Sequence, residues 1–154
     1  MPARRPDPQR LLAALADQRA ELGLGPWSGE GTIESIGAAC ADAVMMAMDA
    51  RVNPLPAALR GAVIYTLDLM SLIAPGPSVE LRVPPFGVVQ CVPGPRHTRG
   101  TPPNVVETDA RTWLLLAAGR LSWAQAKRDG ALRASGPRSD LTSYLPIWTP
   151  RPPA

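Results

Sequence analysis

Residues Val105–Gly136 read VVETDARTWLLLAAGRLSWAQAKRDGALRASG, and this stretch decides the fold. Thr108 and Asp109 carry side-chain oxygens that can accept the free amides of a helix's first turn, so a helix is predicted directly after a strand that begins at Val105. Gly119 stands where a residue of left-handed conformation would end that helix. Apolar residues at helical spacing lie between these two ends, which indicates that one face of the helix is buried.

A second helix and a second strand follow along the same stretch. Ser122 is predicted to cap a helix over residues 123–129, and residues 131–135 alternate apolar and polar side chains as a half-exposed strand does. Ser139 is predicted to cap a last short helix that ends at Tyr144. The side chains predicted to be mostly buried against a sheet are Trp113, Leu116, Leu121 and Trp123.

The N-terminal half is predicted to be helical. One helix is expected over residues 8–22, and two more, over about residues 32–50 and 55–74, are separated by the proline-containing segment 53–56. The apolar face of the last helix is broad enough to predict a helix that is mostly buried. That face comprises Leu59, Val63, Ile64, Leu67, Leu69, Met70, Leu72 and Ile73.

Two strands are predicted between that helix and Val105, over residues 78–83 and 86–92. In the first, apolar residues alternate with Glu80 and Arg82, as on a sheet with one face in solvent. The chain must turn between the strands, because Pro84-Pro85 cannot continue a hydrogen-bonded ladder.

The segment PPFGVVQCVPGPRHTRGTPPN, residues 84–104, and the VVETD that follows it resemble motifs of the sterol-carrier-protein type 2-like family. The resemblance is to small actinobacterial members called bacterial sterol-carrier orthologues, and it covers roughly residues 78–146. It implies an α+β fold, in which a mixed, mainly antiparallel curved sheet is covered by helices and preceded by a helical part. It also implies an apolar cavity that binds a sterol, fatty acid or acyl chain without covalent chemistry.

The chain of 154 residues suggests one domain. We expect an N-terminal lead-in with one helix at 1–30, a single sterol-carrier-like domain at 31–146 and a disordered tail at 147–154. No apolar run is long enough to predict integral membrane association, and no secretory signal is evident. The two cysteines, Cys40 and Cys91, are interpreted as buried small hydrophobes, which fits a cytoplasmic location.

Composition and motifs favour a binding protein over an enzyme. The net charge is +3, and nearly all of the positive charge comes from arginine side chains. No run of basic residues with aromatic residues between them occurs, so nucleic-acid binding is not expected. One histidine and two separated cysteines do not make a metal site, and no nucleophile elbow or phosphate-binding loop occurs. We therefore expect no catalytic residue, no metal and no cofactor. A nucleophilic pair of Cys91 and His97 is conceivable but disfavoured.

The ligand-lining residues are expected on the last N-terminal helix. Val63, Leu67 and Met70 share its apolar face, and methionines at 45, 46 and 48 lie on the helix before it. Methionine side chains are flexible and can refill an irregular space around a ligand. The same residues can also be ordinary core packing, and the sequence leaves both interpretations open.

Arg96, His97 and Arg99 form the most polar cluster of the chain, which continues to Asn104 and Glu107. These cations could bind the carboxylate or phosphate head group of a ligand at the mouth of the cavity. Alternatively, the loop could be held rigid by pairs between its arginines and nearby carboxylates, with Glu80, Glu107 or Asp109 as candidate partners.

Two functions therefore remain open from the sequence. The first is non-catalytic binding or transfer of a hydrophobic or amphipathic small molecule, such as a lipid, sterol or fatty acyl compound. The second is a ligand-free accessory module that binds a protein partner through residues 93–104. The ligand, the oligomeric state and the pathway are not specified by these patterns.

The head-group hypothesis predicts a selective effect of Arg99→Ala. A charge-assisted bond shielded from water is worth roughly 1.5–3 kcal/mol. This variant should therefore weaken binding of a fatty acid more than binding of the matching alcohol, by about tenfold if the bond is worth about 1.4 kcal/mol. Titration of both ligands checks it. Equal weakening of both would instead assign the loop to holding the fold.

Overall fold

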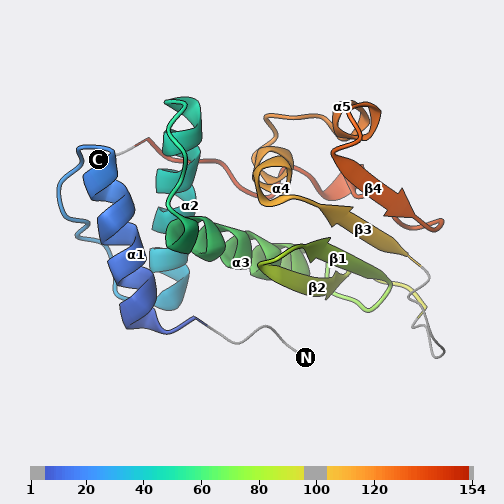
Figure 1. Cartoon of the computed structure of the whole chain (residues 1–154). Coiled ribbons are helices and arrows are strands. Elements are labelled where there is room, and N and C mark those ends of the chain that lie inside the picture. The colour runs from blue at the N-terminus through green and yellow to red at the C-terminus, as the bar shows by residue number, and fades with distance from the viewer. Residues whose placement is uncertain (1–5, 96–103, 153–154) are drawn as a thin grey trace. The chain divides into compact units, whose positions relative to one another are not determined.

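The computed structural model describes residues 6–95 and 104–152 of the chain. Over this part of the chain, helices and strands follow one another in the order shown in Figure 1. They are α1 (Pro8–Glu21), α2 (Ile33–Asp49), α3 (Pro56–Ile73), β1 (Val79–Val83), β2 (Gly87–Cys91), β3 (Val105–Thr108), α4 (Ala110–Ala117), α5 (Trp123–Arg128), β4 (Leu132–Ser135) and the short 3₁₀ helix η1 (Thr142–Tyr144).

The described residues fall into two compact units. The sheet unit comprises Thr66–Thr149, and the helical unit comprises residues 6–65 together with residues 150–152. The boundary lies within α3. The division into a lead-in at 1–30 and a single domain at 31–146 stays a prediction.

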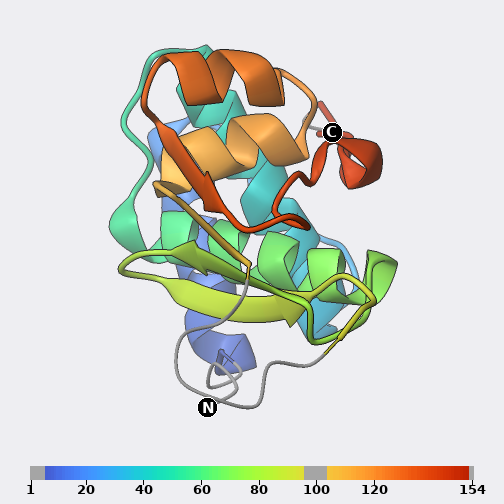
Figure 2. The same cartoon turned by 90° about the vertical axis from the view of Figure 1, so that its right-hand side faces the viewer.

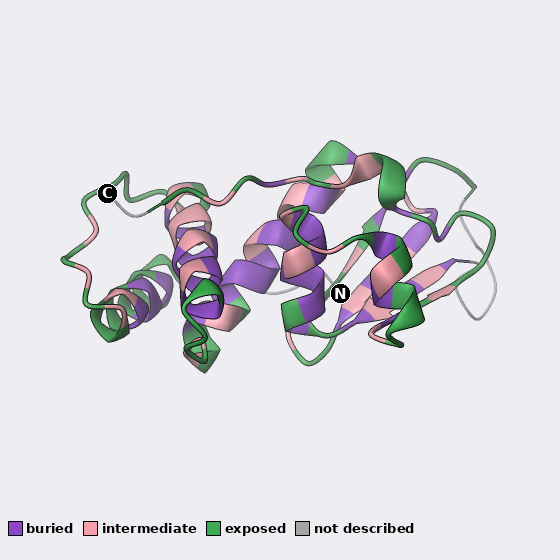
Figure 3. Cartoon of the chain, turned by 90° about the horizontal axis from the view of Figure 1, so that it is seen from above, coloured by how far each residue is buried: buried purple, intermediate pink, exposed green. Residues whose placement is uncertain are grey.

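The helices of the helical unit begin where their capping residues predict. The Asp7 side chain accepts a hydrogen bond from Gln9 N at the start of α1, and the Thr32 side chain accepts one from Ser35 N at the start of α2. Both contacts satisfy amides that have no partner within the helix. The buried residues of α1 recur every three or four positions and so form one face of the helix (Figure 3).

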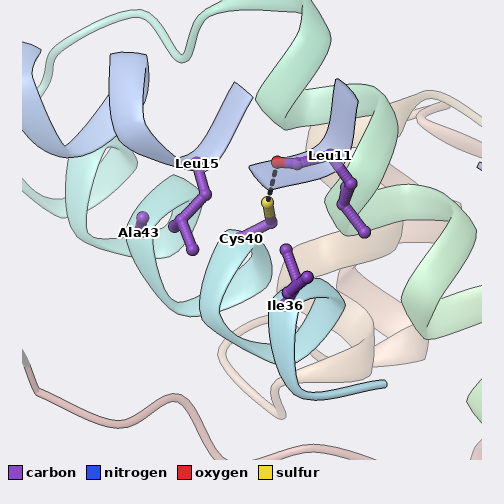
Figure 4. Close-up of a cluster of buried hydrophobic side chains, with 5 residues drawn as sticks. All are labelled: Leu11, Leu15, Ile36, Cys40 and Ala43. Carbon is purple, nitrogen blue, oxygen red and sulfur yellow. Dashed lines mark hydrogen bonds between the residues drawn. The ribbon is translucent and has the colours of Figure 1, made fainter. Parts of the chain in front are cut away.

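The core of the helical unit is a cluster of apolar side chains from α1 and α2. Figure 4 shows Leu11, Leu15, Ile36, Cys40 and Ala43, all of them at most 5% exposed. The Cys40 thiol donates a hydrogen bond to Leu11 O across a distance of 3.8 Å. Cys40 therefore packs as a small apolar residue, as its place in the helical pattern predicts.

The sheet has the strand order β2-β1-β3-β4. β1 pairs with β2 and β3 pairs with β4 in antiparallel fashion, whereas β1 and β3 are parallel. Val79, Leu81 and Val83 of β1 are buried. Glu80 and Arg82 lie on its other face and form an ion pair, in which Arg82 Nη2 is 3.1 Å from Glu80 Oε2. The predicted α+β fold, with a mixed, mainly antiparallel sheet and an N-terminal helical part, is confirmed.

Local capping also determines where α4 and α5 begin. Asp109 accepts hydrogen bonds from Thr112 N at 2.9 Å and from Thr112 Oγ1 at 2.7 Å, and Ser122 accepts one from Gln125 N at 3.1 Å. Gly119 has a φ of 73°, the left-handed conformation that its position after α4 predicts.

The predicted cap of the last short helix was wrong. Ser139 Oγ donates a hydrogen bond backwards to Gly136 O at 2.7 Å, and the amide of Thr142 is instead bound by Asp140 Oδ1 at 2.9 Å. Both residue types can cap, but Ser139 lies within a tight turn after Gly136 and its side chain closes that turn.

Trp113 is the largest fully buried side chain of the sheet unit, and its Nε1 donates a hydrogen bond to Thr66 Oγ1 at 2.9 Å. Leu116 and Trp123 are also buried. Leu121, in the turn between α4 and α5, is of intermediate burial and so is less buried than the other three side chains.

The C-terminal segment is held by backbone hydrogen bonds. Ile147 N and Trp148 N both donate to Ala117 O, at 2.9 and 3.2 Å, and the Trp148 side chain is buried. Residues 147–152 therefore have a defined place in the fold, which differs from the expectation of a disordered tail at 147–154.

By length and composition, α3 is the one helix of the described chain that could cross a membrane. Its window of 18 residues has a mean hydropathy of 1.3, and 44% of that window is buried. A core helix passes the same test, so this finding is weak evidence for a membrane span. The expectation of no integral membrane association stays a prediction.

Replacing Trp113 should destabilise the fold strongly. Trp113→Ala removes a fully buried ring and leaves the Thr66 hydroxyl without its indole donor, so we expect a loss of roughly 3–5 kcal/mol in the free energy of unfolding. Denaturant titration measures it. Arg111→Ala on the exposed side of the same helix is the control and should change stability by about 0.5 kcal/mol or less. Equal midpoints for the two variants would contradict the central role of Trp113.

Candidate functional site

The apolar side chains predicted to line a ligand site are all buried. Val63 and Met70 are fully buried, and Leu67 is 3% exposed. Leu67 and Met70 belong to the sheet unit, whereas Val63 belongs to the helical unit.

The C-terminal half of α3 runs along the β1–β2 hairpin (Figure 2). Near the start of β2, a Cβ atom added at Gly87 would lie 3.1 Å from Leu67 Cδ1, so helix and strand pack closely there. Just beyond the end of β2, Val92 N donates a hydrogen bond to Ala74 O at 2.6 Å. α3 and β2 therefore run in the same direction, from the Leu67–Gly87 contact to the Ala74–Val92 bond.

The sheet face towards this helix is apolar. Val79, Leu81 and Cys91 are fully buried, and together with Leu67 and Met70 they make up what we call the apolar layer. Burial raises the pKa of the Cys91 thiol to about 11. The thiol is consequently protonated at neutral pH and is a poor nucleophile, which weighs against the pair of Cys91 and His97 considered above.

Three apolar side chains outside the layer are exposed to solvent. Leu72 is 77% exposed and Ile73 45% exposed at the end of α3, and Val88 on β2 is 47% exposed. The prediction that α3 is mostly buried was therefore wrong at its C-terminal end. Met70 and Ala74 on the hairpin side of the same turns are buried, so Leu72 and Ile73 are exposed because they lie on the other side of the helix.

A buried polar cluster lies at the end of the sheet where β1 and β3 begin. Asn104 and Ser78 are 3% and 1% exposed. Asn104 Nδ2 donates to Ser78 O at 2.8 Å, and Asn104 Oδ1 accepts from Arg138 N at 2.8 Å. The backbone carbonyl of Asn104 accepts from Glu80 N at 3.0 Å. One amide side chain thus connects β1, β3 and the segment after β4.

Arg138 extends this cluster to the residues after β2. Its Nη1 donates to Pro93 O at 3.2 Å. A Cβ atom added at Gly94 would lie 2.8 Å from Arg138 Nη1 and 2.9 Å from Ser78 Oγ, and Gly94 has a φ of 147°. Glycine at this position therefore leaves room for the guanidinium group. Sequence reasoning did not identify Ser78 or Arg138, because no local pattern links them to Asn104.

The predicted head-group residues Arg96, His97 and Arg99 lie outside the described residues. Two of the carboxylates considered as their partners make other contacts: Glu80 pairs with Arg82, and Asp109 caps α4. Both interpretations of that polar cluster stay predictions. Among residues 6–95 and 104–152, no group of three or more metal-binding side chains is present.

Comparison with protein families gives one match. A family model described as "Bacterial SCP ortholog" matches residues 56–147, which is more than half of the chain. The matched segment begins at the first residue of α3 and ends after η1, so it includes the apolar layer and the polar cluster. No curated protein matches the chain.

The buried polar cluster predicts a stability cost for Asn104→Ala. The variant leaves the buried Ser78 carbonyl and the Arg138 amide without their partner, which should cost about 1–3 kcal/mol. Urea denaturation measures the loss, and Asn53→Ala in the exposed segment between α2 and α3 is the matched control. If both variants unfold at the wild-type denaturant concentration, Asn104 does not hold the strands together.

Proposed function

The chain belongs to the bacterial SCP ortholog family, and on this premise we propose that it binds and carries a hydrophobic or amphipathic small molecule without catalysis. The candidate ligand classes are lipids, sterols and fatty acyl compounds. The observation that carries the proposal is the apolar layer between α3 and the β1–β2 hairpin, which lies wholly within the matched segment.

The binding energy in such a site comes from removing apolar surface from water. Each square ångström of ligand buried contributes roughly 25 cal/mol, so an acyl chain needs few polar contacts to bind. The apolar layer supplies the required surroundings, because its side chains are aliphatic or sulfur-containing. We propose that the ligand lies beside Met70, whose flexible side chain adapts easily, and that Leu67, which packs against Gly87, bounds the site on that side. Val63 remains a proposed lining residue.

A non-catalytic role agrees with the chemistry of the buried thiols. Burial raises the pKa of Cys40 to about 12 and that of Cys91 to about 11, so both are neutral at physiological pH. Both are also unpaired and buried, which supports a proposal that the protein works in a reducing compartment such as the cytoplasm.

One observation favours the second candidate function. The exposed side chains of Leu72 and Ile73 make apolar surface available to another protein at the end of α3. A module that binds a protein partner could use this surface together with the neighbouring residues 93–95, which are also exposed. Such a module would not need to bind any lipid.

Lipid titration separates the two functions. We expect the wild-type protein to bind a fluorescent fatty acid or sterol saturably, and Leu67→Arg to weaken binding at least about tenfold because it places a charge in the apolar layer. Leu12→Arg on the exposed side of α1 is the control and should bind as the wild type does. Circular dichroism establishes that each variant is folded, and Leu67→Phe replaces Leu67→Arg if the charge prevents folding. No binding by folded wild-type protein across a broad lipid panel would favour the interaction module.

A further inference from the structure

The end of the sheet that holds Arg138 is also the end at which the apolar layer stops. α3 and β2 extend together from the Leu67–Gly87 contact to the hydrogen bond between Ala74 and Val92. Pro93 and Gly94 follow at once, and both are exposed. A linear ligand whose tail lies in the layer beside Met70 would therefore present its head group near Pro93 and Gly94.

Arg138 brings a guanidinium group to this point. The side chain is exposed, and its Nη1 donates to Pro93 O at 3.2 Å. A guanidinium group carries several N–H donors in a planar fork, so most of them remain available after one bond to a carbonyl. Arg138 forms no ion pair with a carboxylate of the described residues, unlike Arg82, which pairs with Glu80 at 3.1 Å.

The backbone beneath this guanidinium is fixed by buried groups. Arg138 N donates to Asn104 Oδ1 at 2.8 Å, and Asn104 in turn donates to Ser78 O at 2.8 Å. Because Asn104 and Ser78 are almost fully buried, these bonds are protected from competition with water. The cation is thus held in place before a ligand arrives, which reduces the entropy lost on binding.

Gly94 keeps the approach to the guanidinium open. A Cβ atom at this position would lie 2.8 Å from Arg138 Nη1, well inside contact distance. The residue also has a φ of 147°, a conformation that other residues rarely adopt. A side chain here would displace the guanidinium group and cover one side of it.

We propose that Arg138 binds the acidic head group of an amphipathic ligand, a carboxylate or a phosphate, at the end of the apolar layer. This inference rests on the proposed carrier function and narrows it to anionic ligands. Planar bidentate hydrogen bonds explain the preference for these groups over a hydroxyl, because the guanidinium fork matches two oxygens of a carboxylate or phosphate.

Three ligands of the same chain length but with different head groups test the proposal: palmitic acid, hexadecyl phosphate and hexadecanol. The affinity for each is measured by displacement of a neutral fluorescent probe. For the wild type we expect both acids to bind more tightly than the alcohol. Arg138→Gln should weaken the acids about tenfold and leave the alcohol unchanged, since only the acids use charge-assisted bonds. The two acids also show which head group is preferred.

Arg133→Gln is the matched control, because it removes the same charge from the exposed face of β4. It should leave the affinity for all three ligands as in the wild type. Gly94→Ala retains the charge but crowds the guanidinium, and it should weaken the acids selectively as Arg138→Gln does. Thermal melting of each variant excludes loss of the fold as the cause.

The outcomes distinguish this proposal from the carrier function. If the wild type binds none of the three ligands or the probe, the carrier function itself fails. If all three bind but Arg138→Gln weakens acids and alcohol equally, or changes neither, Arg138 is not the head-group residue although the carrier function stands. An equal loss of acid affinity in Arg133→Gln would assign the effect to net charge and likewise overturn the proposal.

Discussion

The buried side chain of Trp113 and its hydrogen bond to Thr66 connect α4 to α3 inside the sheet unit. Both side chains are fully buried, and the 2.9 Å bond satisfies the indole N–H where water cannot. Thr66 directly precedes Leu67, the residue of α3 that lies against Gly87 of the hairpin. β3 leads straight into α4 through Asp109, so one bond relates α3, α4 and the strands.

Local signals explain why most helix limits could be predicted from the sequence. Asp109 and Ser122 bind amides only three residues away, and such contacts depend on little beyond the neighbouring chain. Burial is harder to predict, because it depends on what covers a residue. Leu72 belongs to the apolar pattern of α3 and is nevertheless exposed, since the pattern cannot show which side of an apolar helix another element covers.

The candidate site was predictable only in its apolar part. Leu67 and Met70 follow from helical spacing, and the structure buries both. The polar part consists of hydrogen bonds between residues distant in sequence: Asn104 to Ser78 over 26 positions, Arg138 to Asn104 over 34 and Arg138 to Pro93 over 45. Nothing in a single sequence indicates such contacts, because each residue would be unremarkable in an ordinary surface turn.

The proposed binding surface is also part of the hydrophobic core, so under the proposed function ligand binding and stability would be coupled. Leu67, Met70 and the inner face of β1 and β2 stabilise the sheet unit when no ligand is present. A ligand that binds only the folded state adds about 2.7 kcal/mol at a free concentration roughly one hundred times its Kd. The close contact at Gly87 and the buried cluster at Asn104 hold the two ends of the layer. In the proposed carrier, adaptation to different ligand tails would therefore fall to the side chains between those ends, of which Met70 is the most flexible.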